Sequence, residues 1–465
     1  MRVILLSLLL WTYTGVMAQS IKVESLPSQK FGALHVYEPA NPQEIVFFLS
    51  GDAGWKYGVV GMAMALAHKG ALVVGVDITH YWSSVQKSKE PCVYLSEDFE
   101  ALSRYLQTKY KFEIYHNPIL VGYSSGATLV YTLLAQAPNE TYQGGIALGF
   151  CPGFTTKKKI CEGSGLHYVS GNKPEQYVLL PRKDMTVPFY VVDGRFDEIC
   201  PPTTYQAFMD SLPSGRLIEL SNVGHGFTKP KNWMPQFLSC YNSIVNPVTI
   251  KKVSPDFPLE IVNTYNDPNM PLVFSISGDG GWKGFIHGLS SDLSKVGIPT
   301  VGLNALSYFW KGKTPEQTTA DISSMVNYYL QVWHRKSFIL LGYSFGADII
   351  PFVVNRMPQQ LKDKLDMIVL LSPDSHADFE FHFASWFDHS STQAFPVLPE
   401  LKRMQNTNAL VFYGQQEKDS LAFELPKNFK EEFVAGGHGY ENNHAHISQV
   451  IIKTLEYFRN QNQSK

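Results

Sequence analysis

The sequence predicts an α/β protein built from two tandem domains, each with a mostly parallel sheet flanked by helices. The first observation is a long internal duplication: Phe47–Trp55 returns as Phe274–Trp282, and Gly122–Ala127 returns as Gly342–Ala347. The copies lie about 220 residues apart, which fits a duplicated domain and far exceeds the period of a solenoid repeat. The second observation is that short β-branched apolar runs alternate with longer helical patterns, as in a parallel sheet covered on both faces.

Apolar runs in each copy are predicted as strands. In the first copy they are Glu44–Leu49, Ala71–Asp77, Pro118–Gly122, Gly145–Leu148, Phe189–Asp193 and Arg216–Leu220. In the second they are Leu272–Ser275, Thr300–Leu303, Ser337–Gly342, Met367–Leu371, Ala409–Tyr413 and Glu432–Val434. Helical patterns between them include Ser96–Lys109 and Thr318–Trp333. The proline-containing stretch 246–256 is predicted as a linker, which gives a first domain at 22–245 and a second at 257–465.

Residues 1–18 have the pattern of a cleavable export signal. Arg2 supplies a positive charge, Val3–Trp11 is apolar, and Val16–Ala18 resembles a cleavage site. The pattern predicts a periplasmic protein, whose cysteines can become oxidised. All five cysteines lie in the first copy, and we expect a Cys151–Cys161 disulfide because these two residues flank one loop.

The composition is that of a globular protein. Hydrophobic residues make up 44% of the 465 residues and charged residues 17%, which does not indicate disorder. The formal net charge of −2 gives no electrostatic reason to expect nucleic acid as a partner. No cysteine has a histidine at the spacing of a zinc site, and we expect neither a metal nor a cofactor.

Each copy carries the pattern G-x-S-x-G, around Ser124 and Ser344. In both copies the pattern follows an apolar strand and precedes a helical run. A serine in such a sharp strand-to-helix turn is the nucleophile of the α/β-hydrolase fold, because the glycines let the helix approach the strand. The sequence therefore predicts two α/β-hydrolase-like domains, each with a serine nucleophile.

A nucleophilic serine needs a base and an orienting acid, which follow it in the order acid, then His, in this fold. The first copy offers Asp197 and then His225. The second offers Glu417 or Asp419 and then His438. Spacing favours Glu417, because it lies 73 residues after its serine (417 − 344), as Asp197 does (197 − 124). Asp419 remains open because aspartate is the commoner acid.

Two further histidines compete with His438 for the role of base. His444 and His446 follow at the expected start of a helix, where they could also form a metal pair. They lack the Gly-His-Gly frame that surrounds His438. We therefore expect them to lie at the solvated surface.

The loop Ser-Gly-Asp-x-Gly-Trp, which follows an early strand of each copy, is predicted to contribute to an oxyanion hole. In this fold that loop donates one backbone N–H, and the residue after the nucleophile donates another. The residues concerned are Gly51, Asp52 and Ser125 in the first copy and Gly278, Asp279 and Phe345 in the second. The two aspartates are not needed for that role. Each could bind an amine on the substrate or hydrogen-bond its own loop.

Several segments of the second copy are specific in combination. They are Ser277–Trp282, Leu306–Trp310, Lys313–Gln317, Gly342–Asp348, Asp378–His382 with Trp386, and Gly436–His438. Together they resemble the VirJ/AcvB-type bacterial virulence proteins, a family of periplasmic α/β-hydrolase-like domains. The first copy shares fewer of these segments, so we expect the second to hold the main activity.

The resemblance implies hydrolysis of aminoacyl-phosphatidylglycerol, with transient contact at a membrane surface. It also implies an association with proteins of type IV secretion systems. Asn304 and Ser307 stand where the family has Asp and Arg, which bears on amino-acid recognition but leaves the triads untouched. The alternative interpretation is a non-catalytic periplasmic binding or chaperone-like protein that keeps the hydrolase frame, since fold does not determine function.

Overall fold

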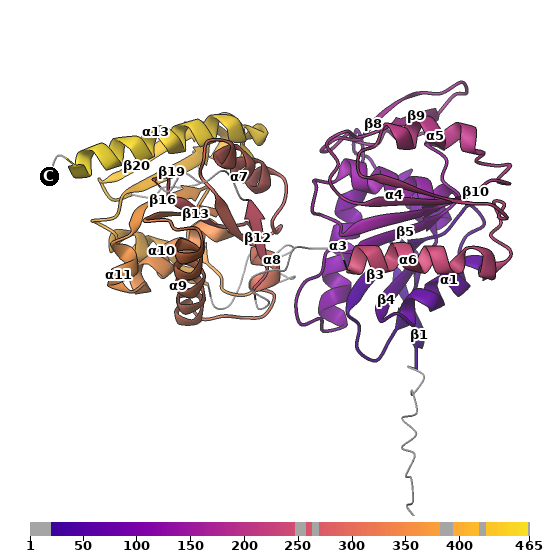
Figure 1. Ribbon diagram of the computed structural model, residues 1–465, viewed down its shortest axis with the longest axis horizontal. Coiled ribbons are helices and arrows are strands. Elements are labelled where there is room, and N and C mark those ends of the chain that lie inside the picture. Colours follow the sequence, from indigo (N-terminus) through magenta and orange to yellow (C-terminus); the bar gives the residue numbers. More distant parts are fainter. Residues whose placement is uncertain (1–19, 247–256, 263–268, 382–393, 418–424, 464–465) are drawn as a thin grey trace, which may run out of the picture.

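The computed structural model describes residues 20–246, 257–262, 269–381, 394–417 and 425–463. It contains two α/β domains (Figure 1). The elements of the first run from Lys22 to Val245, and those of the second from Leu259 to Gln463. The predicted signal peptide at 1–18 and nearly all of the predicted linker at 246–256 lie outside the described residues.

The first domain is built on a sheet with the strand order β1-β2-β4-β3-β5-β6-β10-β11. These strands are β1 (Lys22–Ser28), β2 (Gly32–Glu38), β3 (Glu44–Leu49), β4 (Ala71–Val76), β5 (Ile119–Tyr123), β6 (Gly144–Leu148), β10 (Phe189–Gly194) and β11 (Gly215–Leu220). The pairs β1–β2 and β2–β4 are antiparallel, and the others are parallel. The helices are α1 (Tyr57–Ala67), α2 (Ile78–Val85), α3 (Leu95–Lys109), α4 (Ser125–Gln136), α5 (Pro202–Asp210), η1 (Pro230–Asn232) and α6 (Met234–Val245).

Among the described residues, the second domain repeats this sheet without a counterpart of β1, in the order β12-β14-β13-β15-β16-β19-β20. These strands are β12 (Leu259–Val262), β13 (Leu272–Ile276), β14 (Thr300–Leu303), β15 (Phe338–Tyr343), β16 (Leu365–Leu371), β19 (Ala409–Gly414) and β20 (Phe429–Val434). Antiparallel β12–β14 corresponds to β2–β4 of the first domain. The helices are α7 (Phe285–Lys295), α8 (Ala305–Tyr308), α9 (Pro315–Val332), α10 (Phe345–Arg356), α11 (Gln359–Lys362), α12 (Val397–Lys402), η3 (Gln415–Glu417), η4 (Tyr440–Asn442) and α13 (His444–Gln463), and β17 (His376–Ala377) pairs with β18 (Phe395–Pro396).

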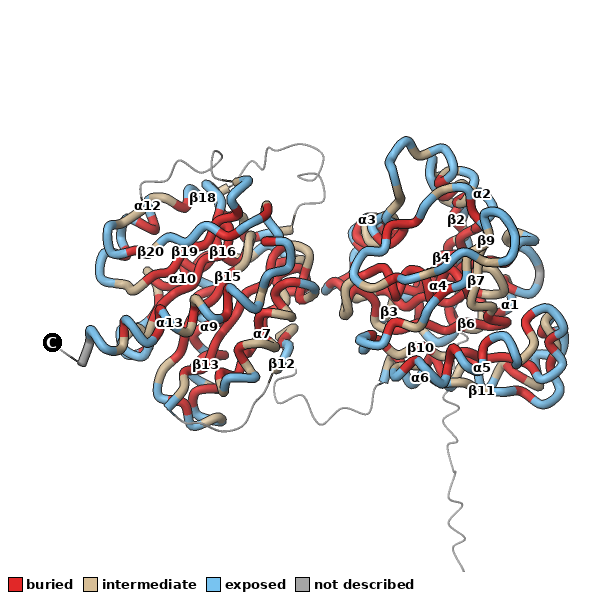
Figure 2. The backbone as a smooth tube through the Cα atoms, turned by 90° about the horizontal axis from the view of Figure 1, so that it is seen from above, coloured by how far each residue is buried: buried red, intermediate tan, exposed pale blue. Residues whose placement is uncertain are grey.

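Helices cover both faces of each sheet, and the buried residues follow the strands between them (Figure 2). In the first domain α1 and α6 pack on one face and α2, α3, α4 and α5 on the other. In the second, α7 and α13 pack on one face and α8 to α12 on the other. This layering confirms the predicted fold class, two α/β-hydrolase-like domains. No helix among the described residues has the length and apolarity that a membrane crossing requires.

A small antiparallel sheet, β7-β9-β8, is inserted between β6 and β10 of the first domain. It is formed by β7 (Gly153–Thr155), β8 (His167–Ser170) and β9 (Gln176–Leu180). The sequence pattern did not predict this sheet, the edge strands β1 and β12, or β2, which lies next to β1. The outermost strand β1 shows why: it is half-exposed, polar and contains a proline, so it lacks the apolar run of a central strand.

The expected Cys151–Cys161 disulfide is wrong. The structure pairs Cys92 with Cys161 and Cys151 with Cys200. Strand β7 leads the chain away from Cys151, and Cys161 then hydrogen-bonds through its N–H to the carbonyl of Val93, beside Cys92. Closeness in sequence therefore did not predict the disulfide partner, because the segment between Cys151 and Cys161 folds away from Cys151 and places Cys161 beside Cys92.

The two domains contact each other through the segment that follows α3 and the segment around α8. The indole N–H of Trp310 donates to the carbonyl of Phe112 at 2.9 Å, and the Ser307 hydroxyl donates to the carbonyl of Tyr115 at 3.1 Å. Figure 1 shows α3 and α8 on the facing sides of the two domains. Part of the Leu306–Trp310 segment is thus used in the contact between domains.

Candidate active sites

Ser124 and Ser344 occupy the same strained turn in the two domains. Ser124 has φ 57° and ψ −123°, and Ser344 has φ 53° and ψ −123°. Each residue directly follows a strand and directly precedes a helix, as the sequence predicted. Residues other than glycine rarely adopt a positive φ, so the surrounding packing must hold this backbone conformation.

The two glycines of the pattern allow the close packing around the first turn. A Cβ on Gly122 would lie 2.2 Å from the carbonyl oxygen of Gly126. A Cβ on Gly126 would lie 2.4 Å from the carbonyl oxygen of Leu49, at the end of β3. The N-terminus of α4 is therefore pressed against the strand ends, and only glycine fits at both positions.

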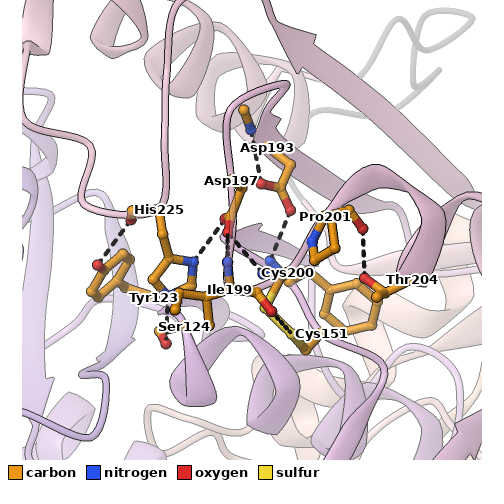
Figure 3. Close-up of polar contacts among 12 residues, drawn as sticks. Tyr123, Ser124, Cys151, Asp193, Asp197, Ile199, Cys200, Pro201, Thr204 and His225 are labelled. Carbon is orange, nitrogen blue, oxygen red and sulfur yellow. Dashed lines mark hydrogen bonds and ion pairs between the residues drawn. A yellow bond between two sulfur atoms is a disulfide. The ribbon is translucent and has the colours of Figure 1, made fainter.

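In the first domain the predicted nucleophile, base and acid form one hydrogen-bonded chain (Figure 3). Nε2 of His225 lies 2.9 Å from Oγ of Ser124, and its Nδ1 lies 2.7 Å from Oδ2 of Asp197. This arrangement requires the tautomer in which Nδ1–H donates to the carboxylate and Nε2 accepts from the serine hydroxyl. The side chain of Asp197 is fully buried and that of His225 is 17% exposed, so the base remains accessible to a small substrate.

Backbone groups orient the acid of this chain. Oδ1 of Asp197 accepts the N–H groups of Ile199 at 2.9 Å and Cys200 at 2.7 Å, which leaves Oδ2 for His225. A second carboxyl lies behind it: Asp193 accepts from the N–H groups of Phe150 and Gly194.

Burial, together with the nearby charge of Asp197, raises the pKa of Asp193 to about 8. Asp193 is therefore mostly protonated at neutral pH and does not compete with Asp197 as the triad acid. Its role was missed in the sequence because it reads simply as the end of an apolar strand.

A tyrosine before each nucleophile holds the histidine loop. The hydroxyl of Tyr123 donates to the carbonyl of His225 at 2.9 Å, and that of Tyr343 donates to the carbonyl of His438 at 3.2 Å. The tyrosine in Gly-Tyr-Ser therefore has the same contact in both domains. The repeated tyrosine was a usable signal, but its partner, a backbone carbonyl about 100 residues away, could not be derived from any sequence pattern.

The first triad opens into a pocket of about 360 Å³. Its lining includes the predicted oxyanion residues Gly51 and Asp52, together with Lys56, Ser124 and His225. A Cβ on Gly51 would lie 3.3 Å from the Cβ of Ser124, so this loop borders the nucleophile directly. The N–H of Ser125, the first residue of α4, lies at the positive end of that helix, where an oxyanion would be stabilised.

In the second domain the predicted acid and base are hydrogen-bonded to each other, but in the described part of the chain the series of hydrogen bonds does not continue to the serine. Nδ1 of His438 lies 2.6 Å from Oε1 of Glu417, which is thus the carboxylate that reaches the ring. Asp419 lies outside the described residues. Among the residues that the structure describes, no hydrogen bond joins Ser344 Oγ to His438.

The predicted oxyanion residues Gly278 and Phe345 lie next to Ser344 as Gly51 and Ser125 lie next to Ser124. A Cβ on Gly278 would lie 3.5 Å from the Cβ of Ser344, and Phe345 begins α10 as Ser125 begins α4. Asp279 follows Gly278 in the same loop. The side chain of His438 is 51% exposed, however, against 17% for His225. The base of the second domain is therefore less enclosed.

Glu417 is fixed by a different set of contacts from Asp197. It accepts from the Ser372 hydroxyl at 2.8 Å and from the Gly414 N–H at 2.9 Å. Burial would raise its pKa, but these two hydrogen bonds and the contact with His438 outweigh burial and lower the pKa. Glu417 is consequently held in the charged form that can orient His438.

The other candidates have structural roles. Nδ1 of His444 lies 2.6 Å from Oδ2 of Asp292, which ties α13 to α7 and removes His444 as a competing base. His446 is exposed on α13. Asn304 accepts the N–H of Ser307 and caps α8, the position that Asp77 fills at the start of α2 in the first domain. In the part of the chain described here, no three His, Cys, Asp or Glu side chains cluster as metal ligands would.

A family model for the bacterial virulence protein VirJ matches residues 43–148 and 270–459, more than half of the chain. The chain belongs to the VirJ family. The second matched segment contains Ser344, Glu417 and His438, whereas the first contains Ser124 and ends before Asp197. A comparison with curated proteins finds no match.

Solved structures of hydrolases are similar to part of this VirJ family chain. Est1E from Butyrivibrio proteoclasticus is 16% identical, covering 44% of this chain and 93% of its own, with a TM-score of 0.32. The esterase domain of a Rhodothermus marinus protein is 13% identical, covering 48% and 98%, with a TM-score of 0.32. An α/β hydrolase from a Medee basin deep-sea metagenome library is 12% identical, covering 49% and 99%, with a TM-score of 0.33. Values this low support no argument about activity.

Proposed function

We propose that the protein is a serine esterase and that its first domain carries out the reaction at Ser124. The observation that carries this proposal is the continuous chain from Ser124 through His225 to Asp197, at 2.9 and 2.7 Å. A buried acid that orients a histidine beside a serine in a strained turn is the arrangement that activates a nucleophile. The earlier expectation that the second domain holds the main activity is not supported by an equally complete chain at Ser344.

The reaction follows from the positions of these groups. Ser124 Oγ attacks the ester carbonyl carbon while Nε2 of His225 accepts its proton. The charge that develops on the carbonyl oxygen faces the N–H of Ser125 and the Gly51 loop. The protonated His225 then gives its proton to the leaving alkoxide. Water, deprotonated by His225, next attacks the carbonyl carbon of the acyl-enzyme. The bond from this carbon to Ser124 Oγ then breaks, the protonated His225 returns its proton to Oγ, and the acid is released.

The pocket chemistry favours an ester that carries both charges. Asp52 and Lys56 are exposed side chains that line the Ser124 pocket. An aminoacyl ester of phosphatidylglycerol presents an ammonium group on one side of the scissile bond and a phosphodiester on the other. Asp52 suits the ammonium and Lys56 the phosphodiester. We therefore propose aminoacyl-phosphatidylglycerol as the substrate, in line with the family, and a transient membrane contact during catalysis.

A binding role is the second candidate, and it concerns the second domain. Its base is half exposed, and in the described part of the chain no hydrogen bond joins His438 to Ser344. This arrangement suits a domain that retains the hydrolase frame but binds a ligand or a protein, including a secretion-system component. For either function, we also propose that the protein is exported to the periplasm. N-terminal sequencing of the mature protein would test this proposal.

Substrate release by the purified mature protein tests the enzyme proposal. Aminoacyl-phosphatidylglycerol in detergent micelles should yield free amino acid, measured by mass spectrometry, and a short neutral acyl ester should be cleaved more weakly. Asp52→Asn should raise KM for the aminoacyl lipid by roughly tenfold, because a charged hydrogen bond is lost, and leave KM for the neutral ester unchanged. Asp279→Asn in the second domain is the matched comparison. Absence of turnover on every ester would favour the binding role.

A further inference from the structure

The disulfide Cys151–Cys200 joins the two loops that lie behind the first triad, at the ends of β6 and β10. Building on the proposed esterase function, we propose that this disulfide is a positioning element that holds the acid loop and thereby aims Asp197 at His225. Neither the sequence patterns nor the triad chemistry assigns it this role.

The contact on the acid side is direct. The backbone N–H of Cys200 donates to Oδ1 of Asp197 at 2.7 Å, the shorter of the two backbone bonds to that oxygen. Any displacement of Cys200 therefore moves the donor that fixes the rotation of the carboxylate. Figure 3 shows Cys200 between the sulfur bridge and Asp197.

The apolar side chains near Asp197 add little packing to the acid loop. Phe196 and Ile199, which flank Asp197, are 66% and 67% exposed. Large apolar side chains left in solvent do not anchor a loop. The buried disulfide at Cys200 is consequently the main covalent restraint on this segment before α5 begins at Pro202.

The other end of the disulfide is attached to rigid elements. Cys151 follows Phe150, a fully buried residue whose N–H donates to Asp193. The carbonyl of Cys151 accepts the Thr128 hydroxyl at 2.8 Å, and Thr128 lies in the first turn of α4, the helix that begins after Ser124. The bridge thus connects the nucleophile's helix to the acid loop.

In the second domain, hydrogen bonds hold the corresponding loops, and no disulfide is available for this purpose. Residue Asp348 occupies the place of Thr128, and its buried carboxyl accepts the N–H of Asp374 at 2.6 Å. Burial raises the pKa of Asp348 well above its usual range. The acid Glu417 is fixed by the Ser372 hydroxyl at the end of β16. No cysteine occurs in this copy, so the disulfide is a device particular to the first domain.

The other disulfide provides a matched control. Cys92–Cys161 closes a loop of similar size, with a sequence separation of 69 against 49, so the two bridges should stabilise the fold to a similar extent. Cys161 accepts from Gln136 at the C-terminal end of α4. That end lies about 18 Å along the helix from Ser124. Removal of the Cys92–Cys161 disulfide should therefore change the stability of the fold without moving Asp197.

The test compares two double variants of the full mature chain, Cys151→Ser/Cys200→Ser and Cys92→Ser/Cys161→Ser. Ester turnover is measured together with the rate at which a fluorophosphonate probe labels Ser124, located by peptide mass spectrometry. Removing Cys151–Cys200 should lower kcat and the labelling rate roughly 10- to 100-fold, because misplacement of a catalytic group by about 1 Å has effects of this size. KM should change less than about twofold, and the control variant should keep its kcat.

Reversible reduction covers the case in which the first variant does not fold. In the Cys92→Ser/Cys161→Ser variant, dithiothreitol transfers two electrons and two protons to Cys151–Cys200 and becomes its cyclic disulfide. Turnover should fall and return on reoxidation. Equal losses in both double variants, or an unchanged kcat without Cys151–Cys200, would overturn the positioning role. A wild-type protein with neither turnover nor labelling would instead overturn the esterase function on which the role rests.

Discussion

The first and second domains share a frame but differ in how much of a catalytic site each one completes. Apart from the outermost strand β1 of the first domain, their sheets have the same strand order, and Ser124 and Ser344 agree in φ to within a few degrees. The loops diverge: His225 hydrogen-bonds both its serine and its acid, whereas the ring of His438 hydrogen-bonds Glu417 and, among the described residues, no hydrogen bond joins it to Ser344. The comparison teaches that the turn around the nucleophile is fixed by the sheet, while assembly of the triad depends on the loops that carry the acid and the base.

The largest expected effect separates the two serines. Ser124→Ala should lower ester turnover roughly 10³-fold or more, as loss of a triad serine does elsewhere. Ser344→Ala should leave most of the turnover, because among the described residues no hydrogen bond joins Ser344 to His438. Circular dichroism and thermal unfolding check that both variants fold. If Ser344→Ala caused the greater loss, the order of the two domains would be reversed.

The acids should differ in the same direction with a smaller effect. Asp197→Asn should lower kcat by roughly 10²- to 10⁴-fold, because the amide cannot accept from Nδ1–H and favours the wrong tautomer of His225. The matched variant Glu417→Gln should change kcat little. Steady-state kinetics on one ester decides between them. A strong loss in Glu417→Gln would show that the second site completes its triad during turnover.

The sequence predicted the frame better than the loops. The strand before each G-x-S-x-G, the acid after a later strand and the glycines around the histidine are short patterns, and they follow one another in the order expected of the fold. Ser124, Asp197 and His225 could therefore be named in advance. The disulfide partners and the role of Asp193 could not, because both depend on how the insertion between β6 and β10 folds back on the sheet. The exposure of His438 likewise depends on long-range packing that no spacing encodes.

A pH effect should appear in the stability of the first domain. The folded pKa of Asp193 is about 8, above the ordinary value of 3.8. The unfolded chain therefore binds fewer protons at Asp193 between these values, so the contribution of Asp193 to stability is present in full below about pH 4 and is lost as the pH rises through about 8. The loss should amount to a few kcal/mol. Hydrogen exchange of β5 and β6 amides between pH 5 and 8 measures it, and Asp193→Asn should flatten the dependence.

The smallest kinetic effect concerns the tyrosines that hold the histidine loops. Tyr123→Phe removes the hydrogen bond to the His225 carbonyl, worth about 1 kcal/mol, and should lower kcat severalfold. Tyr343→Phe removes the equivalent contact in the second domain and should have no measurable effect on the same ester. Equal losses would indicate that both domains contribute to turnover.

Covalent labelling tests the central claim most directly, because it reads the reactivity of both serines in one molecule. The wild-type protein is treated with a limiting amount of a fluorophosphonate probe, and the labelled peptides that contain Ser124 and Ser344 are quantified by mass spectrometry. Reactivity with this probe requires an activated serine. The account predicts that the label is found predominantly on Ser124 and disappears in His225→Ala. Predominant labelling of Ser344, or of neither serine, would contradict it.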